Sequence, residues 1–341
     1  MTEYIKNTDS IEKQLQAKIK HHHVWADYLK RWSLDNKNVC YMTAKKNIVC
    51  DSVRGVAMEK NFYQVKFLSQ EQVIILKMLS SKSPDYLRKQ HETLLDKFLL
   101  MQALELKYKQ SGIKDIKAEK MLHAWKCNSI ENLHTAHEKE ALPIIEALAN
   151  QDLTVLEDIK NMCWFMQFFA QQIARTKNFK DTISTAHNSI NNHAHQELAK
   201  TIEESWWFIS YILGMNMGAD MFATREEDYH CLLINDTETA FITSDQPVIN
   251  VHQALSDEIK PPEDHECDFY YPISPTVAYM VNKSNRFESG RVQVSVDLVE
   301  EMNIKIAKRA NIHIFGNSKE ILKRYQKHVG TNWNAIKDFK T

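Results

Sequence analysis

Residues 162–170 read Met162-Cys163-Trp164-Phe165-Met166-Gln167-Phe168-Phe169-Ala170 and form the longest apolar run of the chain. A membrane-spanning helix needs about 18 or more consecutive apolar residues, so this run has about half the necessary length. It predicts instead a helix buried in a protein core. Glycine and proline are scarce, at seven each in 341 residues, which favours long helices over an all-β architecture with many turns.

Helical patterns continue on both sides of this run. Ser83-Pro84-Asp85 is typical of a helix start with proline in the first turn. Pro143 should kink or break one of the later helices. Residues 69–217 therefore predict a bundle of helices.

Strand-like segments flank the helical block. Residues 39–42 and 47–50 read as two short strands of a hairpin. After Gly218, alternating apolar residues predict strands at 229–235, 239–243, 277–281, 292–296 and 312–316, with a helix over 297–310.

These patterns predict an α+β fold, with a predominantly helical middle inserted between a small N-terminal β-hairpin unit and a C-terminal β-rich part. We expect three units, with an N-terminal helix and hairpin in residues 1–68, the helical insertion in 69–217, and the α+β part in 218–341. The last unit is expected to share a sheet with residues 38–50.

Charge and cysteine usage suggest the compartment. The formal net charge is −1, so no overall basic field attracts nucleic acid or an anionic membrane. The six cysteines contain no CxxC pair, and the N-terminus lacks an apolar leader. We therefore expect a cytoplasmic protein with reduced thiols and no membrane partner.

Several short motifs resemble the family catalogued as domain of unknown function 4238. They are His21-His22-His23-Val24 with Tyr28-Leu29-Lys30-Arg31-Trp32, Glu59 with Phe62-Tyr63, Phe241-Ile242-Thr243-Ser244-Asp245-Gln246-Pro247-Val248, Tyr271-Pro272-Ile273-Ser274-Pro275, and Asn303, Ala307, Ala310 and Phe315. Family members usually have proline where this chain has Trp25. The family has no established activity. The resemblance implies a bacterial protein, for which a role in defence or as a toxin is a common suggestion.

The two polar motifs supply the candidate catalytic residues, which are His22, His23 and Asp245. The histidines precede or begin a helix expected over His23 to Trp32. Asp245 follows a strand, where it could orient a histidine, accept a proton or hold a divalent cation. Serine and aspartate are also frequent in turns for purely structural reasons. A serine hydrolase is disfavoured because no Gly-x-Ser-x-Gly elbow surrounds Ser244.

Two hypotheses follow from these residues. The first is a hydrolase, such as a nuclease, in which a divalent metal activates water. Its candidate ligands are His22, His23, Glu59 and Asp245, and its candidate substrate-binding residues are Arg31, Lys30, Ser244, Thr243 and Tyr28. The second is a non-catalytic binding protein in which the same cluster is a structural polar network and the helical insertion contacts a protein partner.

A nucleic-acid partner would need a local basic patch. The best one combines Lys305, Lys308 and Arg309 with Lys319, Lys323, Arg324 and Lys327. Such a charge run is also typical of a solvated helical face, so both interpretations stay open.

Overall fold

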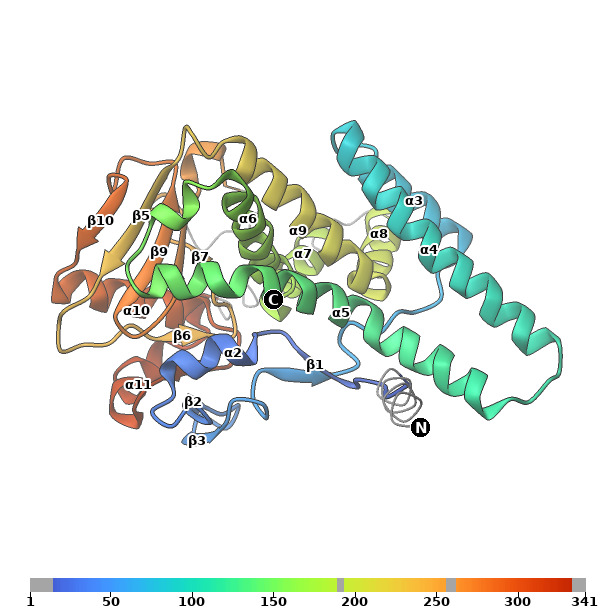
Figure 1. The fold of residues 1–341 in the computed structure, drawn as a ribbon, viewed down its shortest axis with the longest axis horizontal. Helices are drawn as coiled ribbons and strands as arrows, with labels where there is room; N and C mark the ends of the chain where they lie inside the picture. The colour runs from blue at the N-terminus through green and yellow to red at the C-terminus, as the bar shows by residue number, and fades with distance from the viewer. Residues whose placement is uncertain (1–14, 189–192, 256–261, 333–341) are drawn as a thin grey trace, which may run out of the picture.

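The protein, represented by a computed structural model, is described over residues 15–188, 193–255 and 262–332 (Figure 1). The fold is α+β, which confirms the predicted class. Helices α3, α4 and part of α5 extend to one side of the molecule, and the larger sheets lie on the other. The boundaries of the three expected units stay predictions.

The helices dominate the middle of the described chain. Their bounds are α2 Ala26–Leu29, α3 Gln70–Ser80, α4 Asp85–Gln110, α5 Ile116–Ala149, α6 Ile159–Ala174, α7 Lys177–Asn188, α8 His193–Glu204, α9 Trp206–Ala223, α10 Val296–Arg309 and α11 Lys319–Tyr325. Short 3-10 helices lie at η1 Lys30–Trp32, η2 Thr154–Leu156, η3 Asp264–Glu266 and η4 Gln326–His328. Within the described residues, none of these helices combines the length and apolar character that crossing a membrane requires.

The strands come from both ends of the chain. Their bounds are β1 Lys20–His22, β2 Asn38–Met42, β3 Ile48–Ser52, β4 Met58–Lys60, β5 Tyr229–Ile234, β6 Thr243–Ser244, β7 Ile249–Asn250, β8 Asp268–Pro272, β9 Val277–Asn282, β10 Gly290–Gln293 and β11 Ile314–Gly316. They form sheets with the orders β1-β4, β10-β5-β9-β8-β7 and β3-β2-β11-β6.

The antiparallel sheet β3-β2-β11-β6 joins the two ends of the chain. β2 and β3 form the expected antiparallel hairpin, and β11 pairs with β2 through Phe315 opposite Tyr41. On its other side, β11 pairs with β6 through Ile314 opposite Ser244. The strand that leads to Asp245 is therefore held in the same sheet as the N-terminal hairpin, with β11 between them.

Helix α6 is the buried helix that the apolar run predicts. Its aromatic side chains pack against the tyrosines of β8 and β9. The ring centroids of Phe165 and Phe169 lie 4.9 and 5.6 Å from that of Tyr279, in edge-to-face contacts. Phe169 also contacts Tyr271 at 5.8 Å. This contact fixes one face of the helical layer on the sheet β10-β5-β9-β8-β7.

Helices α6 and α9 approach each other closely at two glycines. A Cβ atom added at Gly218 would lie 2.9 Å from the Cα atom of Gln167. One added at Gly214 would lie 2.5 Å from the side-chain amide of Gln171. Glycine at these positions allows the two backbones to pack, even though it costs helix propensity.

One local prediction was wrong, and a second was wrong in its expectation of a helix break. Residues 20–22 form strand β1, paired with β4, and the expected helix from His23 to Trp32 is only the short α2 followed by a 3-10 turn. Pro143 lies inside α5, which continues without a break from Ile116 to Ala149. Buried residues next to the proline, including Ile144 and Ile145, hold this helix against the core and outweigh the lost backbone hydrogen bond.

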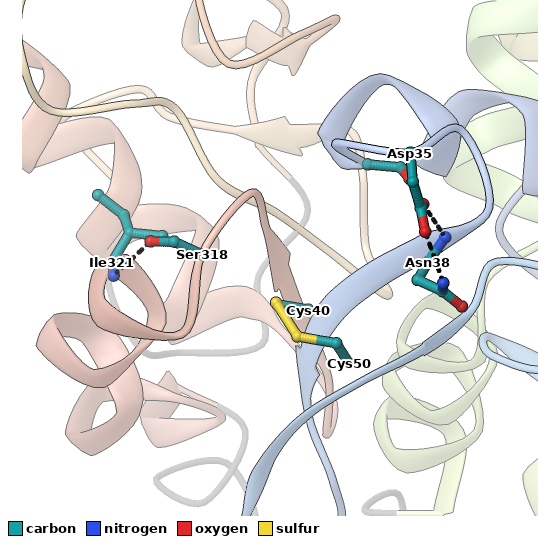
Figure 2. The surroundings of a disulfide bond; sticks show 7 residues. Asp35, Asn38, Cys40, Cys50, Ser318 and Ile321 are labelled. Atoms are coloured by element: carbon teal, nitrogen blue, oxygen red, sulfur yellow. Dashed lines mark hydrogen bonds between the residues drawn. A yellow bond between two sulfur atoms is a disulfide. The ribbon is translucent and has the colours of Figure 1, made fainter.

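A disulfide joins Cys40 and Cys50 across the β2–β3 hairpin (Figure 2). These residues face each other directly in the antiparallel register. The expectation that all six cysteines are reduced was therefore wrong for this pair. The spacing in the sequence gave no CxxC signal because the pairing depends on the hairpin register.

Candidate functional site

His21, the first histidine of the N-terminal motif, has a structural role. His21 is fully buried, and its Nε2–H donates to the carbonyl of Lys18 at 2.7 Å. Its Nδ1 atom accepts the backbone N–H of Tyr63, also at 2.7 Å. Both ring nitrogens are therefore used, and burial lowers the pKa of the imidazole.

The next two histidines have different environments. His22 is partly buried, and its Nε2–H donates weakly to the carbonyl of Arg54 at 3.3 Å. His23 is buried, and burial lowers its pKa to about 3, with further lowering by the charges of His313 and Arg175. His23 is thus a neutral imidazole at physiological pH, and its Nδ1 atom has no partner among the described residues.

The carboxylate of Asp245 holds a backbone turn. Its Oδ1 atom accepts the N–H of Asn311 at 2.8 Å, and its Oδ2 atom accepts those of Ile312 and His313 at 2.7 and 2.8 Å. Burial raises the pKa of Asp245, while His313 and these N–H groups oppose the rise. These three hydrogen bonds use both oxygens of the carboxylate, so its main role is structural.

His313 connects the two predicted segments. It is the largest charge influence on the pKa of His23 and on that of Asp245. Its Nδ1–H donates to the carbonyl of Met42 at 2.7 Å, and its ring contacts Tyr41 of the same strand. The imidazole of His23 and the carboxylate of Asp245 thus both lie near His313.

The residues beside Asp245 also form hydrogen bonds within the protein. The Ser244 hydroxyl bridges the carbonyl and N–H of Gln246 at 2.9 and 3.1 Å, which closes a tight turn. The Tyr28 hydroxyl donates to Pro272 at 2.6 Å and accepts from Thr243 at 2.7 Å. All these groups are buried, so their proposed contacts with a substrate stay predictions.

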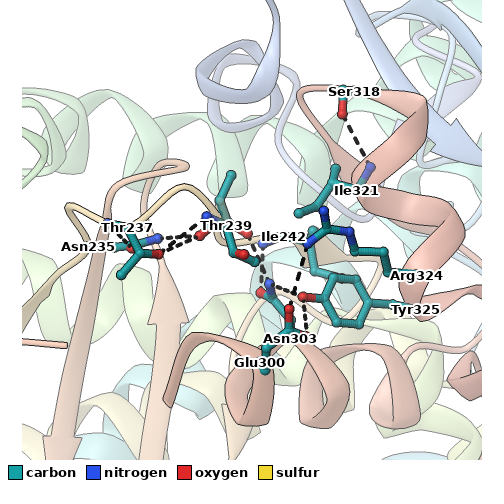
Figure 3. Close-up of polar contacts among 11 residues, drawn as sticks. Asn235, Thr237, Thr239, Ile242, Glu300, Asn303, Ser318, Ile321, Arg324 and Tyr325 are labelled. Atoms are coloured by element: carbon teal, nitrogen blue, oxygen red, sulfur yellow. Dashed lines mark hydrogen bonds and ion pairs between the residues drawn. The ribbon is translucent and has the colours of Figure 1, made fainter. Parts of the chain in front are cut away.

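An asparagine network positions the chain that enters β6 (Figure 3). The Oδ1 atom of Asn303 accepts the N–H of Ile242 at 2.9 Å, and its Nδ2 donates to the carbonyl of Ala240 at 2.9 Å and to the Tyr325 hydroxyl at 3.0 Å. That hydroxyl donates to Glu300 at 2.8 Å. Helix α10 thereby fixes the segment that precedes Asp245.

The remaining predicted residues lie near the periphery. Lys30, the first residue of η1, pairs with Asp27 of α2. Arg31 is partly buried, and its Nε atom has no partner among the described residues. The carboxylate of Glu59 pairs with Lys177 at 3.3 Å, and both side chains are over two-fifths exposed.

A buried ion pair lies between α5 and the end of α6. The Arg175 side chain is 1% exposed, and its Nη1 atom contacts the Glu138 carboxylate at 2.7 Å. Its Nη2 donates to the Gln172 side chain at 3.0 Å, and its carbonyl accepts the Tyr63 hydroxyl at 2.5 Å. Thr176, the next residue, donates to the side chain of Gln246, so this ion pair adjoins the Asp245 turn.

A second carboxylate, Glu131, lies on the same face of α5 as Glu138, two turns earlier. Burial raises the pKa of Glu131 to about 7, which Arg175 opposes and the charge of Glu138 reinforces. A contact with the backbone N–H of His22 also lowers the value slightly. Glu131 therefore exchanges a proton near neutral pH, as a general acid or base requires.

Several buried polar atoms near Arg175 have no hydrogen-bond partner among the described residues. They are His23 Nδ1, Glu131 Oε2, His134 Nδ1 and Nε2, His137 Nδ1, Gln171 Oε1 and Arg175 Nε. Unpaired buried groups are uncommon in folded proteins and often indicate ordered water or a functional site. We call Glu131, Glu138 and Arg175, together with His22 and His134, the Arg175 centre.

Comparison with known proteins gives one match. A family model described as "Protein of unknown function (DUF4238)" matches residues 20–320. The chain belongs to this family. No curated protein and no solved structure matches the chain.

The described residues of this DUF4238 protein do not provide a metal centre. Among them, no group of three or more His, Cys, Asp or Glu side chains is arranged to hold a metal ion. Asp245 binds backbone N–H groups, and Glu59 pairs with Lys177. We therefore derive no chemical step through a metal.

The sequence patterns of this DUF4238 chain pointed to His22 but to no other residue of the Arg175 centre. Arg175 follows an apolar helix and belongs to no recognisable motif. A signal was nevertheless present in α5, where Glu131, His134 and Glu138 recur at helical spacing among apolar residues. Titratable residues on the inward face of a helix are candidates for a polar site.

Proposed function

We propose that this protein is a hydrolase whose acid–base group is Glu131. The observation that carries the proposal is a carboxyl group with a pKa of about 7, placed beside a buried arginine. At neutral pH this carboxyl is divided between its two protonation states, so it can take a proton from water and return it to a leaving group.

The neighbouring groups support this role. Arg175 supplies a fixed positive charge in a poorly solvated region, where electrostatic stabilisation of a developing oxyanion is strong. Glu138 and Gln172 hold its guanidinium in place. His22 and Glu131 are partly exposed, so a substrate would approach from their side.

The narrower form of the proposal is a nuclease that acts as a bacterial defence or toxin effector. In that form the substrate is a phosphodiester, and the catalytic assignment of His22, His23 and Asp245 is retained as a prediction. The geometry favours His22 for contact with substrate, because it is the most accessible of the three.

The test is a screen of carboxylic ester, phosphomonoester, DNA and RNA substrates with the full chain. We expect kcat/KM for the active substrate to rise with an apparent pKa near 7 if Glu131 acts as the base. Glu131→Gln should lose at least about 100-fold in kcat. Glu140→Gln, which removes an exposed carboxylate of the same helix, should retain activity. Full activity of Glu131→Gln would refute the proposal.

A binding protein is the second candidate, favoured by the exposed apolar side chains of the helical middle. They include Ile74, Met78, Leu100, Ile113, Ile116 and Met121, each more than half exposed. Exposed apolar side chains are typical of a protein-binding surface where they lie together. Under this alternative, His23→Ala lowers the free energy of unfolding by roughly 1–3 kcal/mol. The wild-type protein then shows no enzymatic activity that the substitution could abolish.

A further inference from the structure

The turn between α4 and α5 lies at one end of the longest axis of the molecule, with no other labelled element beyond it (Figure 1). We call residues 104–120 the α4–α5 tip; they comprise the end of α4, this turn and the start of α5. Every residue from Lys109 to Lys117 is exposed to solvent. The tip shares no residue with the Arg175 centre, so its surface needs a separate explanation.

Large aliphatic side chains are exposed at the α4–α5 tip. Ile113 and Ile116 are 66% and 72% exposed. On α4, Leu104 and Leu106 are 48% and 43% exposed. A single exposed aliphatic side chain is common on a protein surface and needs no explanation, whereas several close together are typical of an interaction site. The tip therefore presents an apolar surface for binding.

Lysines lie between these aliphatic side chains. The tip contains five lysines and three carboxylates, so its net charge is +2. The carboxylate of Glu105 is buried and is paired with Lys109 at 2.8 Å and with Lys126 at 2.9 Å. The other lysines of the tip are exposed and form no ion pair with any acidic residue that the structure describes; they are Lys107, Lys114, Lys117 and Lys120.

Hydrogen bonds hold the tip in a defined shape. The Tyr108 hydroxyl donates to the carbonyl of Asp115 at 3.1 Å and accepts its backbone N–H at 2.8 Å, which joins the end of α4 to the start of α5. The Asp115 carboxylate accepts the N–H groups of Lys117 and Ala118 at 2.8 and 3.2 Å and so caps α5. Because the turn is already ordered, a partner that binds it pays little conformational entropy.

The combination of exposed aliphatic side chains and unpaired lysines favours an anionic membrane surface as the partner. There, apolar side chains enter the boundary between headgroups and acyl chains, and lysines are attracted to the anionic lipids. Lysine is depleted from protein–protein interfaces, where aromatic side chains and arginine are enriched. Single-stranded nucleic acid is bound by aromatic stacking, and the one aromatic residue of the tip, Tyr108, closes the turn.

We propose that the α4–α5 tip docks on the surface of an anionic lipid bilayer. Ile113 and Ile116 enter the headgroup layer. The ammonium groups of Lys114 and Lys117 bind the anionic headgroups. The net charge of −1 does not reveal this site, because acidic residues elsewhere in the chain balance the lysines of the tip. The proposal thus departs from the expectation of no membrane partner, which depended on that net charge, and it is independent of the hydrolase assignment.

Co-sedimentation of the full chain with lipid vesicles at low ionic strength tests the proposal. We expect vesicles of mixed phosphatidylcholine and phosphatidylserine to bind the protein at least about tenfold more strongly than vesicles of phosphatidylcholine alone. Each lysine near an anionic surface contributes roughly a factor of five, so Lys114→Gln combined with Lys117→Gln should weaken binding about 25-fold. Ile113→Ser combined with Ile116→Ser should weaken it at least about tenfold, because less apolar area enters the bilayer.

A matched pair of substitutions elsewhere controls for general effects on the surface. Ile159, at the start of α6, is 55% exposed, and Lys160 beside it is also exposed. Ile159→Ser combined with Lys160→Gln should change vesicle binding less than about twofold, because these residues lie outside the tip. Since all the substituted side chains are exposed, each variant should keep the wild-type melting temperature, which circular dichroism measures.

Four results would overturn the proposal. The first is no binding to the mixed vesicles, and the second is equal binding to both kinds of vesicle. The third is equal weakening by the tip variants and the control variant, which would show that the tip is not the site. The fourth is dimerisation without vesicles that Ile113→Ser combined with Ile116→Ser abolishes, which would assign the tip to a second copy of the chain.

Discussion

Replacing Glu131 by glutamine should stabilise the protein at high pH while it removes the proposed acid–base group. Burial raises the pKa of Glu131 from 4.5 to about 7, so the folded state prefers the neutral carboxyl. As the pH rises from about 4.5 to 7, the unfolded chain loses this proton first, and the free energy of unfolding falls. At 1.36 kcal/mol per pKa unit the full loss is about 3 kcal/mol, which partial solvent access reduces to about 2 kcal/mol.

Glutamine mimics the neutral carboxyl at every pH. The variant should therefore exceed the wild-type free energy of unfolding by less than about 1 kcal/mol at pH 5 and by about 2 kcal/mol at pH 8. Urea denaturation followed by circular dichroism at pH 5, 6, 7 and 8 measures this difference. Glu140→Gln, on the exposed face of the same helix, is the matched control. A difference between Glu131→Gln and wild type that stays constant with pH would refute the reasoning.

Three further sets of substitutions test the structural contacts around the site. Asp245→Ala leaves three buried N–H groups without an acceptor and should lower the free energy of unfolding by about 3 kcal/mol or more in urea denaturation; a loss below about 1 kcal/mol would contradict the structural role. Gly218→Ala should destabilise by about 1–2 kcal/mol because its Cβ would meet Gln167, and a more stable variant would show that α6 and α9 separate easily. Replacing Cys40 and Cys50 together by serine should cost about 2–3 kcal/mol, measured without reductant, since the disulfide closes a loop with a sequence separation of 10; a difference that persists in reductant would point to another cause.

The parts of the fold that local patterns determine were predictable. The hairpin of residues 39–50 and the buried helix over 162–170 follow from alternation and from apolar content. Strand β1 could not be predicted, because Lys20, His21 and His22 have no marked preference for strands. These residues are extended because they pair with β4. The continuity of α5 through Pro143 likewise depends on tertiary packing, which no local window contains.

The site was predictable only in part, for a related reason. The two polar motifs were identified, and the structure places both near His313, a residue without a motif of its own. Sequence patterns alone could not show that the Asp245 carboxylate is occupied by three N–H groups from residues 311–313. Nor could they show that Glu131 is partly buried near Arg175, since its pKa depends on the distance between two helices.

The N-terminal histidine motif and the Arg175 centre are parts of one structure. His21 accepts the backbone N–H of Tyr63, and the hydroxyl of Tyr63 donates to the carbonyl of Arg175 at the end of α6. His21 therefore supports Arg175 through Tyr63, while His22, the next residue, places its backbone N–H against Glu131. Because consecutive side chains of a strand point to opposite faces, His21 supports the buried frame while His22 stays accessible. This alternation gives the adjacent histidines different roles. We therefore expect His21→Ala mainly to lower the free energy of unfolding, and His22→Ala mainly to lower the catalytic activity.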